Sequence, residues 1–500
     1  MESLSYVSPS RLKGEASLVG TYTLTRSLRK SDCSHLPNHG RDELRTKFTV
    51  ALSEMYKSEV PLYGDLIKIV RRVDDLVLRQ QGLKRQDLPL RHDLERHGAI
   101  RVGSDEEMRI IRRLFAVLGM HPVGYYDLTI VDFPLHATAF RPISEDSLAS
   151  NPFRVFTSVL RKDLLSEDTR DTVERILKKR SLFTPRLLEI LDAAEASGSV
   201  KSEDADDFVA ESLKIFKWHG RSTVSLEDYL KLKKEHPMIA DIVCFPSAHI
   251  NHLTPRTLDI DLVQEEMIKR HLPAKDRIEG PPRRKCPVLL RQTSFKALEE
   301  PVSFPGIDGS LTPGSHTARF GEIEQRGAAV TRKGRELYDE LLRCATQQAA
   351  SDGSNFDEAW AKVFEAYPDD WDELRARGLV YFRYRLSDDR RNGTNGVQNS
   401  KDLRPDIASA EDLLSSGVLE CEPITYEDFL PLSAAGIFKS NLGGDTSQSP
   451  SIRDTLGSMS DLEEVLGCEI ESQFDVYDRL QRESLGRCAK KLGLQDILID

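Results

Sequence analysis

Two histidines and one glutamate lie in three separate stretches of the chain that each have the pattern of a β-strand. His97 is in the run "RHGAIRV", His252 is in "HINHLTP" and Glu322 is in "RFGEIEQRG". Two imidazoles and one carboxylate are the ligands of a facial triad, which leaves positions on Fe(II) open for substrate and dioxygen. Strands of a curled sheet can bring such side chains to one point, because alternate residues face the same side.

Each ligand position except the first has a rival close by. Residues 249 and 252 face opposite sides of a regular strand, so at most one of His249 and His252 normally enters the site. Glu322 and Glu324 face the same side, and their spacing does not distinguish them. We expect three further histidines near strand ends to be structural: His121, His136 and His316.

Arg101 follows His97 by four residues in the same run. The even offset places both side chains on one face of a strand. A guanidinium binds a carboxylate through two parallel hydrogen bonds. The spacing therefore predicts that the Arg101 guanidinium can reach into the same hollow as His97.

Composition excludes several classes of protein. The chain has 500 residues, a net charge of −11 and 39% hydrophobic residues, which is ordinary for a globular protein and argues against a nucleic-acid partner. We find no apolar run long enough to span a membrane. The seven cysteines are scattered and lack metal-site spacing, as in proteins of a reducing compartment. We expect a cytoplasmic protein, with mitochondrial or plastid targeting left open, and find no signal for the oligomeric state.

The elements that must position these residues form a repeated pattern. The first copy of the pattern has a strand at 96–103, a helix that begins after Ser104 or Asp105 and ends at Gly119, and strands at 122–130 and 135–143. The second copy has a strand at "HINHLTP", a helix at 259–272, and strands at 286–302 and 317–331. The pattern predicts an α+β fold in which paired βαβββ modules form a curled sheet around a metal.

The remaining segments flank or interrupt these modules. We expect a disordered tail at 1–40, the first module with its preceding helices at 41–149 and a helical insertion at 150–236. The second module follows at 237–332, a region that completes the pocket at 333–445, and a tail with a helix at 446–500.

Four blocks carry a resemblance to known families. The paired modules resemble the vicinal oxygen chelate superfamily, and "GEIEQRG" resembles the metal-glutamate strand of 4-hydroxyphenylpyruvate dioxygenase, which points to Glu322. "RHGAIRVGS", "HINHLTPRTLDID", "ARFGEIEQRGAAVT" and "YEDFLPLSAAGIFKSNL" resemble the 2-oxoadipate dioxygenase/decarboxylase family, also called hydroxyglutarate synthase. The resemblance covers roughly residues 40–445.

This resemblance implies a role for each site residue. It implies Fe(2+) held by His97, His252 and Glu322, with no catalytic residue beyond the metal ligands. Arg101 matches the substrate arginine, and a substrate-contacting Val-Ser pair falls on Leu432 and Ser433, so that leucine replaces valine. One added methylene in an apolar pocket is worth about 1–3 kcal/mol.

The implied reaction converts 2-oxoadipate and O2 to 2-hydroxyglutarate, expected as the D form, and CO2, within lysine degradation. The expected partners are therefore a 2-oxo dicarboxylate and dioxygen. A non-redox metal-dependent isomerase or lyase of the same superfamily, or a binding protein that has lost catalysis, remains an alternative. Such isomerases often use a fourth protein ligand, whereas only three convincing ligands are present here.

Overall fold

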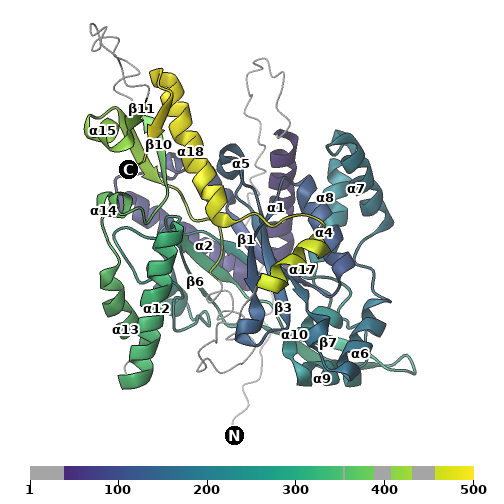
Figure 1. Ribbon diagram of the computed structural model, residues 1–500. Coiled ribbons are helices and arrows are strands. Elements are labelled where there is room, and N and C mark those ends of the chain that lie inside the picture. Colours follow the sequence, from purple (N-terminus) through teal and green to yellow (C-terminus); the bar gives the residue numbers. More distant parts are fainter. Residues whose placement is uncertain (1–38, 353–354, 388–406, 431–455, 500) are drawn as a thin grey trace, which may run out of the picture. The chain divides into compact units, whose positions relative to one another are not determined.

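The computed structural model of the protein describes residues 39–352, 355–387, 407–430 and 456–499 (Figure 1). The expected disordered tail lies outside the described residues except for its last two positions, and Leu432 and Ser433 also lie outside them. Within the described residues, runs of helices and runs of strands build a mixed α+β fold, as the sequence predicts. None of the described helices combines the length and the apolar character that a membrane crossing requires.

A five-stranded sheet contains the first βαβββ pattern. Its strands are β1 (Arg96–Val102), β2 (His121–Asp127), β3 (Leu135–Arg141), β4 (Arg154–Leu160) and β5 (Leu253–Pro255), in the order β2-β3-β4-β1-β5. Helix α4 (Asp105–Val117) connects β1 to β2, and the Ser104 hydroxyl caps it by accepting a hydrogen bond from the Glu107 amide. Gly119 follows with a φ of 69°, the left-handed conformation that glycine adopts at helix ends.

Strand β4 lies in a segment where the sequence predicts helical structure. The sequence predicts helices throughout 150–236, whereas residues 154–160 pair with both β1 and β3. Every residue of β4 is buried, so "RVFTSVL" lacks the alternation that marks a strand with one exposed face. The helices of the insertion begin after this strand.

The second half of the pattern is present, but its strands are shorter than expected. Helix α11 (Ile260–Lys269) follows β5, and β6 (Leu290–Ser294) pairs antiparallel with β9 (Glu322–Arg326). A parallel bridge between Arg256 and Glu324 connects the end of β5 to β9. The predicted strand at 286–302 divides into β6 and the start of a hairpin, β7 (Glu299–Pro305) and β8 (Leu311–Thr317). The described strands do not form a closed sheet.

Helices surround these strands. Two long helices precede β1, α1 (His39–Glu59) and α2 (Pro61–Gln80), and they share an apolar core with β1 and α4. The remaining helices of the N-terminal half, other than single 3-10 turns, are α3 (Arg91–Leu94), α5 (Glu145–Ser150), α6 (Glu167–Leu177), α7 (Pro185–Ser197), α8 (Ala205–Phe216), α9 (Leu226–Glu235) and α10 (Pro237–Val243).

The C-terminal part has its own apolar core. Its helices are α12 (Arg332–Asp352), α13 (Phe356–Val363), α14 (Trp371–Ala376), α15 (Ala410–Ser415), α17 (Leu456–Leu466) and α18 (Gln473–Leu492), and its strands are β10 (Phe382–Leu386), β11 (Ile407–Ser409), β12 (Leu419–Pro423) and β13 (Asp496–Leu498). Helix α18, predicted near 473–492, packs along β10 (Figure 1), while α17 packs on α4.

Candidate metal centre

The register of three strands brings His97, His252 and Glu322 together. In the antiparallel pair β1–β5, His97 lies opposite Thr254, so these two side chains share a face. His252 precedes Thr254 by two residues and faces the same side. The Thr254 hydroxyl in turn donates a 2.9 Å hydrogen bond to Oε1 of Glu322 on β9. Strand pairing therefore directs all three candidate ligands to one point.

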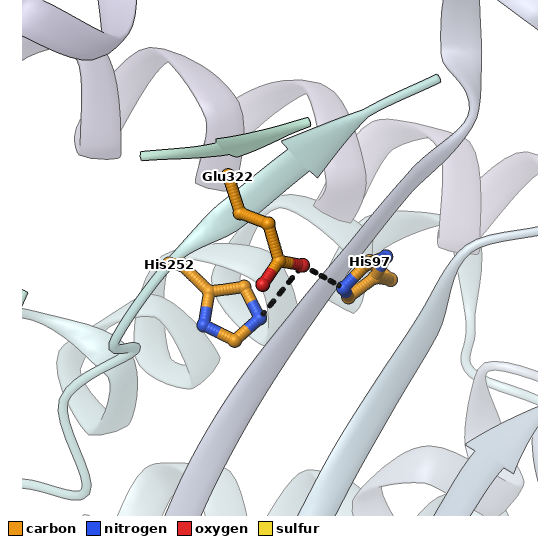
Figure 2. Close-up of side chains that lie close together, drawn as sticks. All are labelled: His97, His252 and Glu322. Carbon is orange, nitrogen blue, oxygen red and sulfur yellow. Dashed lines mark ion pairs between the residues drawn. The ribbon is translucent and has the colours of Figure 1, made fainter. Parts of the chain in front are cut away.

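The ligand atoms of the three residues lie close together (Figure 2). Nε2 of His97 is 2.8 Å from Oε1 of Glu322, and Nε2 of His252 is 3.8 Å from the same oxygen. His97, His252 and Glu322 are 1%, 3% and 0% exposed. Oε2 of Glu322 is buried and has no hydrogen-bond partner among the described residues. Such an atom is costly unless a further group satisfies it.

The structure separates the two pairs of rivals that spacing leaves open. His249 does not lie with His97; its Nε2 is 3.2 Å from Oδ1 of Asp241 in a different cluster. Glu324 does reach His97, but on the other side of the ring, where its Oε2 is 3.0 Å from Nδ1. Glu322 and Glu324 thus flank the imidazole of His97, and Glu322 is the carboxylate grouped with both histidines.

Burial and neighbouring charges set the protonation of the three groups. Burial lowers the pKa of His252 to about 4, so its imidazole is neutral at pH 7 and keeps the lone pair that binds a metal. Burial also lowers the pKa of His97, but the carboxylates of Glu324 and Glu322 outweigh burial and raise it above its ordinary value. Burial raises the pKa of Glu322, yet the two histidines and Thr254 hold it below its usual range.

A buried network of charges holds Glu324 in place. Oε2 of Glu324 is 2.7 Å from Nη2 of Arg326, and its Oε1 accepts a 3.4 Å hydrogen bond from Arg154. Arg154 also donates to Glu95 at 2.6 Å and to Glu427 at 2.9 Å. Burial alone would raise the pKa of Glu324, but Arg326, His97 and Arg154 hold it well below its usual range. A carboxylate on the far nitrogen of a histidine fixes the orientation and tautomer of the ring.

Aromatic side chains line the apolar side of the centre. The ring of Phe429 lies 5.0 Å from that of His97, and the ring of Phe320 lies 4.8 Å from that of His252. Phe156 packs against Phe429 at 5.4 Å. These contacts limit the access of water, which strengthens electrostatic interactions inside the site. Phe429 also lies close in sequence to the predicted substrate residues Leu432 and Ser433, which are outside the described part of the chain.

Arg101 lies on the same strand face as His97, as predicted, and its charge contributes to the low pKa of His252. It is 7% exposed, and its Nη1 donates a 2.7 Å hydrogen bond to Oδ2 of Asp241 in α10. Sequence inspection missed Asp241. A signal is present, because an acidic residue stands alone in the apolar helix "PMIADIV", and a buried carboxylate needs a partner.

Comparisons with known proteins identify the family of this chain. The family model for 2-oxoadipate dioxygenase/decarboxylase matches residues 48–441. Two curated relatives of that name, from Escherichia coli and Pseudomonas putida, are 47% and 45% identical over 453 and 465 residues. They cover 89% and 91% of this chain, and the matches span 98% and 97% of the relatives.

A solved structure supports the same assignment. The crystal structure of the hydroxyglutarate synthase from Pseudomonas putida in complex with 2-oxoadipate is 43% identical, with a TM-score of 0.78, and the match covers 91% of this chain and 99% of that one. The family model spans the strands that carry His97, His252 and Glu322. The chain belongs to the 2-oxoadipate dioxygenase/decarboxylase family.

Proposed function

We propose that this protein is an Fe(II)-dependent enzyme that converts 2-oxoadipate and O2 to 2-hydroxyglutarate and CO2. The observation that carries the proposal is the buried cluster of His97, His252 and Glu322 in a chain that belongs to the 2-oxoadipate dioxygenase/decarboxylase family. The reaction balances without a second organic substrate. One atom of dioxygen enters the new carboxylate, and the other becomes the hydroxyl group.

The three residues fit a divalent transition metal. His252 is neutral at pH 7, Glu322 has an unpartnered buried oxygen, and His97 turns its Nε2 toward that carboxylate. Two imidazoles and one carboxylate suit Fe(II) and leave further positions open. Bound Fe(II) would supply the Lewis acidity and the redox chemistry that activates dioxygen. The chain itself would hold the ring of His97 through Glu324 and keep water away through Phe429 and Phe320.

Arg101 is the group that we assign to the distal carboxylate of the substrate. It lies four residues from His97 on β1, and a dicarboxylate bound at the metal through its keto acid end needs a cation at the other end. A buried guanidinium offers this charge together with a defined geometry. We assign Leu432 and Ser433 to the same end of the substrate, on the family resemblance alone.

The sheet arrangement supports the same assignment. We propose that the two βαβββ patterns form one curled sheet around the metal, as in the vicinal oxygen chelate superfamily. Support comes from the pairing of β1 with β5 and from the parallel bridge between β5 and β9. The boundaries of the six regions that the sequence predicts stay proposals.

The cellular setting is a proposal of the same kind. The six described cysteines are all free, which supports a reducing compartment such as the cytoplasm. The D form of the product and a role in lysine degradation follow from the family resemblance.

Anaerobic reconstitution followed by an oxygen-electrode assay tests the function. The metal-free protein is loaded with Fe(II), Zn(II) or Mg(II), and oxygen uptake is followed after addition of 2-oxoadipate. We expect uptake only with Fe(II), one CO2 per O2, and both atoms of labelled dioxygen in the 2-hydroxyglutarate. Turnover with Zn(II) or Mg(II) without oxygen uptake would instead identify an isomerase or lyase, and no turnover with any metal would contradict the proposal.

A further inference from the structure

The guanidinium of Arg101 is held by a carboxylate from outside the metal-binding strands. Nη1 of Arg101 donates to Oδ2 of Asp241 at 2.7 Å. Asp241 is 3% exposed and lies in α10, the last helix before the segment that leads to His252 and β5. An arginine side chain is long and has many rotamers, so a fixed partner reduces the entropy that it loses when it binds a ligand.

The other oxygen of Asp241 is fixed in turn. Nε2 of His316 lies 2.8 Å from Oδ1 of Asp241, and Nδ1 of His316 lies 3.0 Å from the hydroxyl of Tyr229. Because a carboxylate only accepts, His316 donates to Asp241 through Nε2, and its other ring nitrogen pairs with the Tyr229 hydroxyl. Nε2 of His249 lies 3.2 Å from the same oxygen of Asp241. Burial would raise the pKa of Asp241, but Arg101 and His249 hold it well below its usual range, so the carboxylate is charged.

The residues of this chain of contacts come from elements that the metal cluster does not use. Tyr229 is on α9 and Asp241 is on α10, whereas His316 is on β8 of the hairpin that separates β6 from β9. In Figure 1, α9, α10 and β7 lie close together, and their apolar side chains share one core. Trp218 packs against the ring of His249 at 4.8 Å. Helix α9 of the insertion, helix α10 and the hairpin therefore meet around Asp241, which contacts Arg101.

We infer that Asp241 is a positioning residue that aims the Arg101 guanidinium at the distal carboxylate of the substrate, and that His316 and Tyr229 hold Asp241 in place. This inference rests on the proposed function, because it requires Arg101 to bind that carboxylate. The bond to Asp241 is made by Nη1 of Arg101. A misplacement of about 1 Å in such a group costs about 100-fold in rate, so the anchor would set the preference for dicarboxylates.

A second metal ion is the competing explanation for a cluster of Asp241, His249 and His316. Both nitrogens of His249 are buried without a hydrogen-bond partner among the described residues. Both nitrogens of His316, however, already have partners, and the positive charge of Arg101 lies against Asp241. A cation bound there would be repelled by Arg101 at short range in a buried site. Positioning of Arg101 explains the same contacts without this repulsion.

The test compares 2-oxoadipate with 2-oxohexanoate, which has a methyl group in place of the distal carboxylate. The iron-loaded wild type is compared with Asp241→Asn, Tyr229→Phe and Arg101→Ala. Asp261→Asn is the matched control, because Asp261 also holds an arginine, Arg291, through contacts of 2.7 and 2.9 Å. The measured quantities are the kcat/KM for 2-oxoadipate divided by the kcat/KM for 2-oxohexanoate, and the iron content per chain.

We expect Asp241→Asn to lower this ratio by about 10- to 100-fold, mainly through the KM for 2-oxoadipate, with 2-oxohexanoate turnover and one iron per chain retained. Tyr229→Phe should lower the ratio by about two- to tenfold, which corresponds to the loss of one hydrogen bond. This variant also tests the inference if Asp241→Asn does not fold. Asp261→Asn should leave the ratio unchanged. The double variant of Asp241 and Arg101 should lose no more than Arg101→Ala alone.

Four outcomes would overturn the inference. If both kcat/KM values stay at the wild-type level in Asp241→Asn and Tyr229→Phe, or if the ratio rises, Asp241 only neutralises Arg101. If both kcat/KM values fall by the same factor, which also leaves the ratio unchanged, Asp241 has a structural role. Two metal ions per wild-type chain, falling to one in Asp241→Asn, would identify a metal site. If Arg101→Ala itself keeps the wild-type ratio, the assigned role of Arg101 fails, and the inference fails with it.

Discussion

Two buried clusters in this chain have the same donor types but differ in what surrounds them. His97, His252 and Glu322 form one, and Asp241 with His249 and His316 forms the other. Both clusters contain buried ligand atoms without a hydrogen-bond partner among the described residues, one oxygen of Glu322 in the first and both ring nitrogens of His249 in the second. In the second cluster, however, Arg101 pairs with Asp241, whereas no described arginine is paired with Glu322. The positive charge beside the carboxylate therefore distinguishes the positioning network from the candidate metal site.

The largest effect should separate the two clusters by metal binding. His97→Ala, His252→Ala and Glu322→Ala should each reduce iron content and turnover to background, because each removes one of three ligands. His249→Ala should keep one iron per chain. Iron analysis and oxygen uptake on the purified variants measure this. Loss of iron in His249→Ala with retention in His252→Ala would reverse the assignment.

Glu322 and Glu324 offer a second contrast, since they flank one histidine. Glu324→Gln should destabilise the fold by about 3–5 kcal/mol, because Arg326 and Arg154 lose a buried partner. It should weaken metal affinity by about 10- to 100-fold. Glu322→Gln should abolish metal binding with a smaller effect on the unfolding free energy of the metal-free protein. Denaturant unfolding and Fe(II) titration give both quantities, and the opposite pattern would make Glu324 the ligand.

Arg101 separates charge from geometry at the substrate end. Arg101→Ala should weaken 2-oxoadipate recognition by about 2–5 kcal/mol, because the distal carboxylate is left unpaired. Arg101→Lys keeps the charge without the fork and should show an intermediate loss. Iron content should not change in either variant. Steady-state kinetics check this, and equal losses on 2-oxohexanoate would assign Arg101 to the structure of β1.

Metal removal should affect stability through the first cluster alone. At a free Fe(II) concentration 100 times the Kd, binding stabilises the folded state by about 2.7 kcal/mol. A chelator should remove this stabilisation from wild type and from His249→Ala, and should not affect His252→Ala. Anaerobic unfolding with and without chelator measures the difference. A chelator response in His252→Ala would place the metal elsewhere.

The smallest effect is expected at Leu432. Leu432→Val removes one methylene, a change worth at most about 1–3 kcal/mol in an apolar pocket. 2-Oxoadipate should remain the best substrate, and 2-oxo acids with added bulk should be accepted better by the variant. Competition assays with longer and branched 2-oxo acids test this. A wild-type preference for such acids would contradict the assigned substrate.

Local patterns were enough to predict much of the fold, whereas the choice of His252 and Glu322 as ligands came from the family resemblance. The even offset between His97 and Arg101 predicts their common face, and the cap at Ser104 predicts the start of α4. Strand β4 was missed because all of its residues are buried, so its sequence shows no alternation. Spacing also left His249 and Glu324 open, because it gives the face of a strand but not the neighbour that the face meets.

The charged surroundings of the cluster could not be predicted from local patterns. Arg154 meets Glu95 across 59 residues and Glu427 across 273 residues. Asp241 meets Arg101 across 140 residues. Such pairs depend on the tertiary fold, and sequence inspection would ordinarily place each of these charged residues on the surface. The only general indication is that a charged residue buried in the fold needs a partner of opposite charge.

Anomalous diffraction at the iron absorption edge tests the central claim most directly. Crystals of the wild-type protein grown anaerobically with Fe(II) should show a single strong peak between His97, His252 and Glu322, and crystals of His252→Ala should show none. A peak at Asp241, His249 and His316, or no peak at the first cluster in an active protein, would contradict the assignment.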